Sequence, residues 1–342
     1  MRGPKRPLGE FDLIARMARV LPLRGEGVIL SVGDDTAVVA SPPGEVLCLT
    51  VDEVIEDVHF DARFSPGDVG WKALAVNLSD LASMGARPLW ALVALAFPRE
   101  EPTARILGVA RGIAACARRY GIAVVGGNVS RARALSIAIT AVGSVRPGRF
   151  LTRAGARPGD LLLGSGSFGE AALGLAPGAA PALLRRQRRP TPRLALGRAL
   201  AGIARAAIDV SDGLAQDLGH VAEASRVAAV LEESRVPTSP AYRRRALSLA
   251  DPMAPALAGG EDYELLVAVP PARLRAALDA ARRAGTPLSV MGRFERGRGV
   301  RIVRADGRSR PAPSGHDHLR APAPRPPSTG SGQALDKARG RL

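Results

Sequence analysis

Lysine is scarce in this sequence. Of its 342 residues only Lys5, Lys72 and Lys337 are lysines, so arginine supplies nearly all of the positive charge. The chain therefore has neither a Gly-x-x-x-x-Gly-Lys-Ser/Thr loop nor a Val-Ala-Ile-Lys strand, which excludes a P-loop and a protein-kinase nucleotide site. Metal ions, arginine side chains and backbone amides must therefore bind any phosphate group that this protein takes up.

Cysteine and long apolar runs are lacking as well. Cys48 and Cys116 each lie in an apolar segment, which predicts buried free thiols rather than a disulfide framework. No apolar stretch reaches the roughly 18 residues of a membrane-spanning helix, and residues 1–11 lack the apolar centre of a signal peptide. We therefore expect a cytoplasmic protein without a membrane partner.

Positive charge is abundant but is spread along the chain. The formal net charge is +16, a value that can indicate nucleic-acid binding. The densest cluster, Arg185-Arg186-Gln187-Arg188-Arg189, has no interleaved aromatic residues, whereas single-strand binders stack bases on such residues. We interpret the cluster as a solvated basic linker and expect no nucleic-acid partner.

Aspartates recur beside short apolar segments. They are Asp34 and Asp35 after 28–32, Asp52 after 47–51, Asp80, Asp209 and Asp212. Each alone fits a turn or a helix N-cap. Adjacent carboxylates repel one another unless a cation lies between them, and Mg²⁺ prefers such oxygen ligands. The set as a whole predicts a shared site for metal and phosphate.

Residues 68–85 give the clearest helical pattern, with Asp68 as the expected cap and Gly85 at the end. The face opposite its apolar stripe carries Asn77, Asp80 and Met84 at spacings of three and four. Because buried carboxylates need partners, Asp80 is a candidate metal ligand.

Two glycine-rich segments follow predicted strands. Gly126-Gly127-Asn128-Val129-Ser130 permits close approach of a phosphate to the backbone, and it equally fits a plain turn. Residues 164–169 match Gly-x-Gly-x-x-Gly, but the acidic residue expected about 20 positions later is missing. We therefore reject a dehydrogenase, which stays only a weak competitor.

Strand-like and helix-like segments alternate along the chain in two halves of similar rhythm, and the length suits two domains. This pattern predicts an α/β fold. Residues 321–342 are rich in proline, serine, glycine and arginine, a composition typical of a disordered basic tail; a docking tail is the functional alternative.

An ordered series of motifs resembles the thiamine-monophosphate kinase family, within the aminoimidazole-ribonucleotide synthetase superfamily. The motifs are Gly9-Glu10-Phe11, Gly33-Asp34-Asp35, His59-Phe60, Asn77-Leu78-Ser79-Asp80, Asp209-Val210-Ser211-Asp212-Gly213 and Gly259-Gly260-Glu261-Asp262-Tyr263-Glu264. The resemblance implies a two-domain PurM-like fold: an N-terminal domain over 1–147 that binds ATP and Mg²⁺ and forms a homodimer through its sheet, and a C-terminal domain over 148–320.

The resemblance also implies the roles of single residues. The implied magnesium ligands are Asp35, Thr50, Asp52, Asp80, Asp209 and Asp212; the ATP contacts are Gly127, Arg153 and Ser211; the contacts to thiamine phosphate are His59 and Glu261. Three positions depart from the family pattern. Asn128 replaces an aspartate and offers an amide oxygen to metal and ATP, Val51 replaces a threonine, and Leu319 replaces an aromatic residue at the substrate.

The implied reaction transfers the γ-phosphoryl group of ATP to thiamine monophosphate and gives thiamine diphosphate. A phosphate acceptor has a second pKa of about 6 and is already anionic at neutral pH, so we expect no general base among the catalytic residues. The alternatives are an amidine-forming synthetase of the same superfamily and a non-catalytic nucleotide-binding protein.

Overall fold

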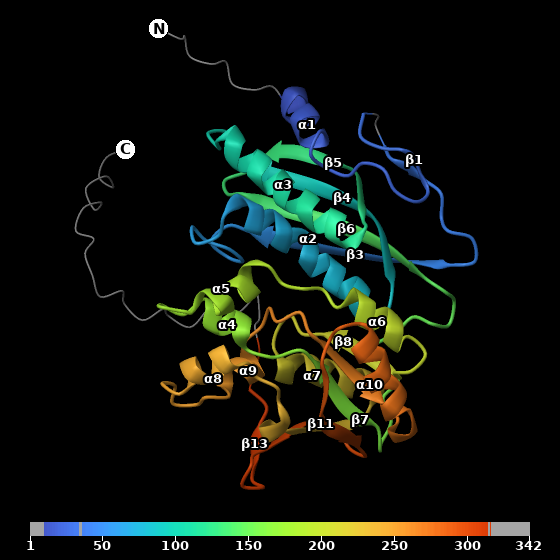
Figure 1. Ribbon diagram of the computed structural model, residues 1–342, viewed down its shortest axis with the longest axis vertical. Helices are drawn as coiled ribbons and strands as arrows, with labels where there is room; N and C mark the ends of the chain where they lie inside the picture. The colour runs from blue at the N-terminus through green and yellow to red at the C-terminus, as the bar shows by residue number, and fades with distance from the viewer. Residues whose placement is uncertain (1–9, 34–35, 314, 316–342) are drawn as a thin grey trace, which may run out of the picture.

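Two β-sheets lie one above the other, and the helix α2 runs between them (Figure 1). The computed structural model describes residues 10–33, 36–313 and 315. Asp35, Leu319 and the tail 321–342 lie outside the described residues. The described chain begins with α1 (Glu10–Ala18), followed by a two-stranded sheet of β1 (Val28–Leu30) and β2 (Val38–Val39).

The upper sheet has four strands in the order β3-β6-β4-β5. Their bounds are β3 Val46–Ile55, β6 Ser136–Val145, β4 Arg87–Phe97 and β5 Ala123–Arg131. The strand β3 pairs with β6 along its whole length, so Asp52, which follows the apolar segment 47–51, lies opposite Ile139 inside a strand. Residues 126–130 likewise continue β5, paired with β4, instead of forming a loop.

The two faces of this sheet differ. The helices α2 (Pro66–Ser83) and α3 (Thr103–Tyr120) cover one face. On the strands β3 and β4, the residues that point the other way leave apolar side chains in solvent: Leu49 is 68% exposed, Val51 63% and Leu92 42%. The sheet therefore presents an uncovered apolar surface.

The helix α2 is buried on nearly all sides, with 14 of its 18 residues buried. Its N-cap is Ser65, whose hydroxyl accepts the backbone N–H of Asp68 in a capping box, so the helix starts earlier than predicted and Asp68 is its third residue. At Gly70 a Cβ would overlap the Val109 carbonyl of α3. Glycine there lets the two helices cross closely.

The lower sheet has seven strands in the order β13-β12-β9-β11-β7-β10-β8. Their bounds are β7 Leu161–Ser165, β8 Ala206–Asp209, β9 Ala228–Glu232, β10 Leu265–Val269, β11 Leu288–Glu295, β12 Gly299–Val303 and β13 Ser309–Pro311. The strand β9 lies between β11 and β12, antiparallel to β11 and parallel to β12.

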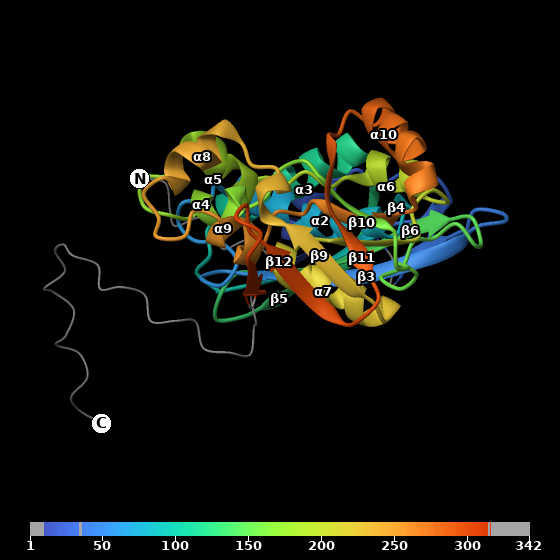
Figure 2. The same ribbon diagram turned by 90° about the horizontal axis from the view of Figure 1, so that it is seen from below.

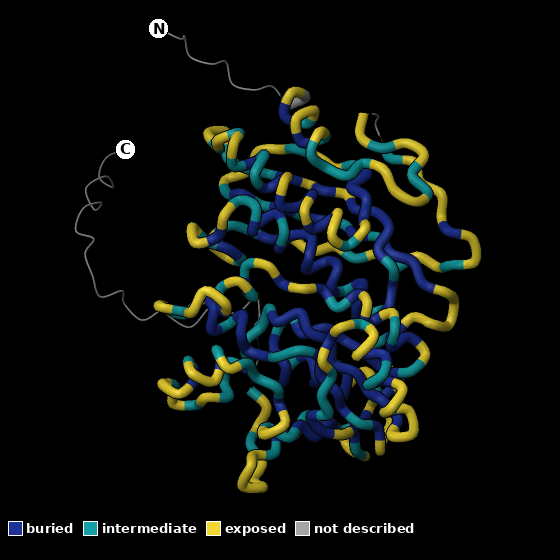
Figure 3. The backbone as a smooth tube through the Cα atoms, in the orientation of Figure 1, coloured by how far each residue is buried: buried dark blue, intermediate teal, exposed yellow. Residues whose placement is uncertain are grey.

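Helices cover both faces of the lower sheet. Their bounds are α4 Glu170–Gly174, α5 Pro181–Arg188, α6 Leu194–Leu200, α7 Leu214–Ser225, α8 Pro240–Ala246, α9 Ala254–Ala258 and α10 Leu274–Arg283. Figure 2 shows α7 and α10 on opposite sides of this sheet. Successive residues of a strand point to opposite faces of the sheet, so they belong to different cores. Leu163 and Val267 join the core that contains α2 and the upper sheet, whereas Leu162 and Leu266 join a second core with α7. The first core runs across both domains, as the buried tube segments of Figure 3 indicate.

The basic cluster is not a solvated linker. Residues 185–188 end α5, where Gln187 is 1% exposed, and Arg186 pairs with the buried Glu170 and Glu264. Arg189 pairs with Asp68 of α2. Buried carboxylates elsewhere in the chain therefore order this segment, and composition alone did not reveal them.

The cysteines are free: Cys116 is buried, and Cys48 is half-buried. In the described part of the chain, no helix has the length and apolar character needed to span a membrane.

Candidate active site

A cavity of about 800 Å³ lies between the two domains. The strand β3 and the helix α2 supply one side, and the segments 209–212 and 260–263 with Gln187 of α5 supply the other. Nine of the residues predicted to bind metal, ATP or the acceptor line it: Thr50, Asp52, His59, Asp80, Arg153, Asp209, Ser211, Asp212 and Glu261. Segments far apart in the sequence thus meet in one cleft.

The carboxylates of Asp52, Asp80, Asp209 and Asp212 converge in this cavity, and burial together with neighbouring negative charge raises the pKa of two of them, Asp52 and Asp209. Burial, with the charges of Asp80 and Asp212, raises the pKa of Asp52 to about 7. Burial, with the charge of Asp80 adding, raises the pKa of Asp209 to about 8. Burial also raises the pKa of Asp80, against the opposing effects of Thr50 and Arg153. Such mutual repulsion favours a bound cation.

The helix α2 fixes the positions of these carboxylates. The Thr50 hydroxyl of β3 donates to Asp80 Oδ2 at 2.5 Å, and the backbone N–H of Asp52 donates to Asn77 Oδ1 at 2.9 Å. The side-chain amide of Asn77, which is fully buried, donates to the Ala73 carbonyl of the same helix. The helix α2 therefore orients ligand candidates on β3 as well as its own Asp80.

The donor set suits Mg²⁺. Carboxylate and hydroxyl oxygens of Thr50, Asp52, Asp80, Asp209 and Asp212 face one cavity, and hard oxygen ligands are those that Mg²⁺ prefers. Arg153 is the one arginine or lysine among the described residues that line the cavity. The local charge is thus negative, and an anionic substrate needs added cations to bind there.

Two of the predicted substrate contacts, His59 and Glu261, line the cavity, and both contact Lys72 of α2. His59 Nδ1 accepts the Ile55 backbone N–H at 3.1 Å. Glu261 is held by Lys72, whose Nζ lies 2.5 Å from its Oε1, and by the side-chain amide of Gln187. The sequence did not assign any role to Lys72 or Gln187; the rarity of lysine and the glutamine inside an arginine cluster were the available signals.

The segment 259–264 adopts a strained backbone at the cavity. Glu261 and Tyr263 have φ values of 66° and 52°, in the left-handed region that non-glycine residues seldom occupy. Backbone bonds hold it: Glu261 N–H donates to the Ser211 carbonyl at 2.7 Å and Tyr263 N–H to the Val210 carbonyl at 2.8 Å. The same bonds join the Asp209–Asp212 segment to the segment that carries Glu261.

Gly127 and Asn128 do not reach this cavity. They lie on β5 and line a separate small cavity of about 70 Å³ with residues of α1 and β4. The strands β3 and β5 form opposite edges of the four-stranded sheet, so three strand spacings of about 4.8 Å, roughly 14 Å, separate them. Within one chain, the structure does not bring these two residues to the aspartates.

Both domains match models of one protein family. Residues 33–145 match the family of AIR synthase related proteins, N-terminal domain, and residues 157–304 match the C-terminal domain of that family. The thiamine-monophosphate kinase of Haemophilus influenzae is 40% identical over 273 residues, which are 77% of this chain and 82% of that protein.

Two solved structures superpose on most of this chain. A thiamine-monophosphate kinase from Stenotrophomonas maltophilia K279a superposes with a TM-score of 0.79 at 38% identity, covering 90% of this chain and 98% of that one. A structure described as AaThiL complexed with AMPPCP and TMP superposes with a TM-score of 0.73 at 31% identity, over 93% and 100% of the two chains. The chain belongs to the thiamine-monophosphate kinase family.

Proposed function

We propose that the cavity between the two domains is where this kinase transfers the γ-phosphoryl group of ATP to thiamine monophosphate. The observation that carries the proposal is the convergence of Asp52, Asp80, Asp209 and Asp212 at one cavity that also contains Glu261. A related structure is described as bound to AMPPCP and TMP, which supports an ATP-like donor and this acceptor.

Thr50, Asp52, Asp80, Asp209 and Asp212 would hold Mg²⁺. Bound Mg²⁺ supplies the positive charge that lets two phosphate groups approach each other. Among the chain's own groups, Arg153 meets the phosphates of ATP and offsets the carboxylates, since its charge acts on Asp80. Ser211 contributes to the same wall of the cavity.

His59 and Glu261 bind the acceptor and align it with the donor. The acceptor phosphate is already an anionic nucleophile at neutral pH, so alignment and charge stabilisation are the main catalytic contributions. No residue need remove a proton.

A second copy of the chain would complete the site. Leu49, Val51 and Leu92 form an uncovered apolar face on the upper sheet, and exposed patches of this kind mark interaction surfaces. We propose a homodimer through this face, in which Gly127 and Asn128 act at ATP from the opposite sheet edge. Asp35 as a further Mg²⁺ ligand and Leu319 as an acceptor contact belong to the same proposal, and both lie outside the described residues. We also propose a cytoplasmic enzyme whose domains divide near residue 147.

The test is incubation of the purified protein with ATP, Mg²⁺ and thiamine monophosphate, followed by separation of the thiamine esters and measurement of free phosphate. We expect thiamine diphosphate and ADP in equal amounts, with no free phosphate. Phosphate release without thiamine diphosphate would favour an amidine-forming synthetase. Binding of ATP without turnover would favour a non-catalytic nucleotide-binding protein.

A further inference from the structure

Lys72 is a charged side chain buried in the helix between the two domains. It is 1% exposed, and three oxygens surround its ammonium group: Glu261 Oε1 at 2.5 Å, the His59 carbonyl at 2.8 Å and Gln187 Oε1 at 2.9 Å. An ammonium group has three protons to donate. The Lys72 ammonium group donates hydrogen bonds to the His59 carbonyl and to Gln187 Oε1, and it forms an ion pair with Glu261. Two of these three contacts go to residues proposed to bind the acceptor.

Gln187 closes the arrangement. Its carbonyl oxygen accepts from Lys72 while its amide group donates to Glu261 Oε2. Lys72, Gln187 and Glu261 therefore contact one another in a ring, although they come from α2, α5 and the segment 259–264. The Glu261 side chain keeps 24% of its surface exposed, and this residue lines the cavity.

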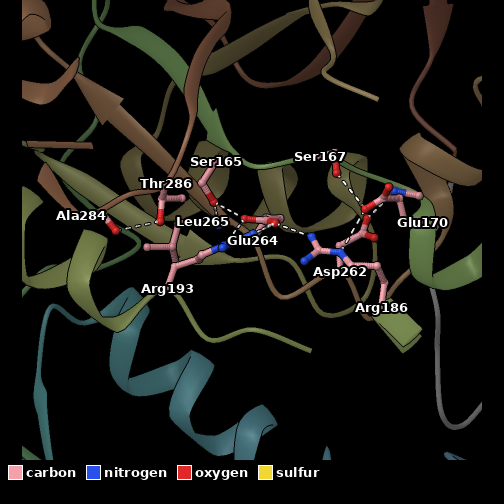
Figure 4. Close-up of polar contacts among 11 residues, drawn as sticks. Ser165, Ser167, Glu170, Arg186, Arg193, Asp262, Glu264, Leu265, Ala284 and Thr286 are labelled. Atoms are coloured by element: carbon pink, nitrogen blue, oxygen red, sulfur yellow. Dashed lines mark hydrogen bonds and ion pairs between the residues drawn. The ribbon is translucent and has the colours of Figure 1, made fainter. Parts of the chain in front are cut away.

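Ion pairs with buried carboxylates of the C-terminal domain also hold α5 in place. Figure 4 shows Arg186 and Arg193 approaching the fully buried Glu264 from two sides. The Ser165 hydroxyl donates to Glu264 Oε2 at 2.5 Å, and Arg186 also pairs with Glu170. Gln187, the next residue after Arg186, is thereby held at Glu261 by a buried network in the C-terminal domain.

The ring formed by Lys72, Gln187 and Glu261 holds a residue whose backbone is strained. Glu261 has a φ of 66°, and a conformation of this kind persists only when its surroundings hold it. Among the described residues, the polar contacts of the Lys72 ammonium group go to Glu261, His59 and Gln187, and none goes to the proposed metal ligands. Lys72 therefore acts on the residues proposed to bind the acceptor.

We propose that Lys72, together with Gln187, is a positioning residue that sets the affinity for thiamine monophosphate by fixing Glu261 and His59 relative to each other. The inference rests on the proposed function of the cavity. Lys72 does not touch the substrate; its effect passes through the two residues that do.

The test compares the Michaelis constants of both substrates in the purified full-length enzyme. For Lys72→Met and Gln187→Leu we expect KM for thiamine monophosphate to rise about tenfold or more. We expect KM for ATP to stay within about twofold, because the contacts that are lost hold only the residues proposed to bind the acceptor. An unchanged KM for the acceptor, or an equal rise for both substrates, would overturn the proposal.

A matched control separates positioning from stability. Arg205→Met breaks another ion pair to a buried carboxylate, Asp160, outside the cavity. It should lower the melting temperature and leave both KM values unchanged. If Lys72→Met fails to fold, Gln187→Leu decides, because it removes only a neutral partner.

Coupling to Glu261 gives a second readout. If Lys72 acts through Glu261, the double variant Lys72→Met/Glu261→Gln should raise KM for the acceptor no more than the stronger single variant, whereas additive effects would contradict the inference. A wild-type enzyme that makes no thiamine diphosphate would instead refute the proposed function. The same variants would then be compared by calorimetric titration with thiamine monophosphate, where unchanged binding would refute the positioning role.

Discussion

The Ser79 hydroxyl of α2 donates a 2.6 Å hydrogen bond to Asp209 Oδ2 at the end of β8. The bond joins the N-terminal domain to a proposed metal ligand of the C-terminal domain, and both residues are buried. The next residue, Asp80, faces the same cavity. One helix therefore holds the carboxylates of both domains in register, and any motion between the domains would separate the proposed metal ligands.

Asp80→Asn should separate a metal ligand from a structural carboxylate. The change keeps the shape and removes a charge that raises the pKa of Asp52 and Asp209, so repulsion in the metal-free protein falls. We expect an equal or higher melting temperature without Mg²⁺ and a loss of kcat by orders of magnitude. Thermal melts in EDTA and steady-state kinetics measure both.

Asp160→Asn is the matched control for that experiment. Asp160 accepts the Arg157 backbone N–H and pairs with Arg205 away from the cavity, so its loss should cost about 1–3 kcal/mol of stability and leave kcat unchanged. If Asp80→Asn behaved like Asp160→Asn, destabilised but active, Asp80 would be a structural residue.

Chelation of divalent metal should abolish turnover. The cavity offers carboxylates and a single arginine among its described residues, and Lys72 is engaged by Glu261, so no side chain there replaces the cation. We expect no thiamine diphosphate in excess EDTA and full recovery when Mg²⁺ exceeds the chelator. EDTA already saturated with Mg²⁺ is the control; turnover that survives chelation would contradict the metal site.

Glu264→Gln should destabilise the C-terminal domain strongly. The Glu264 side chain has no exposed surface and pairs with both Arg186 and Arg193. Removing one partner of a buried charge pair typically costs about 3–5 kcal/mol, which urea denaturation would measure. Asp279→Asn, which removes a surface pair with Arg282, should change stability little. Similar losses in the two variants would mean that the buried network is not a stabilising one.

Leu49→Asp should disrupt the proposed homodimer. Leu49 is 68% exposed on the open face of the upper sheet, where a charge would be buried if two such faces met. Light scattering after size exclusion should give twice the chain mass of 35.6 kDa for the wild type and the single-chain mass for the variant. Leu247→Asp, on a residue that is 83% exposed in the other domain, should remain dimeric. A monomeric wild type would exclude this interface.

The sequence by itself determined the features that depend on neighbouring residues. Apolar spacing predicted a helix over residues 68–85, and the structure has α2 over Pro66–Ser83, because one helical face repeats every three to four residues. The aspartates beside apolar segments predicted a shared carboxylate site, and the cavity contains Asp52, Asp80, Asp209 and Asp212.

Only the tertiary structure decided which distant charges meet. Arg186 looked solvated in an arginine cluster, yet it pairs with Glu264, 78 positions away, and Lys72 reaches Glu261 in the other domain. Gly127 and Asn128 followed a predicted strand as Asp52 does, but sheet order puts them at the opposite edge. Periodicity and residue type act over a few positions of the chain, whereas ion pairing and strand order depend on how the two domains pack.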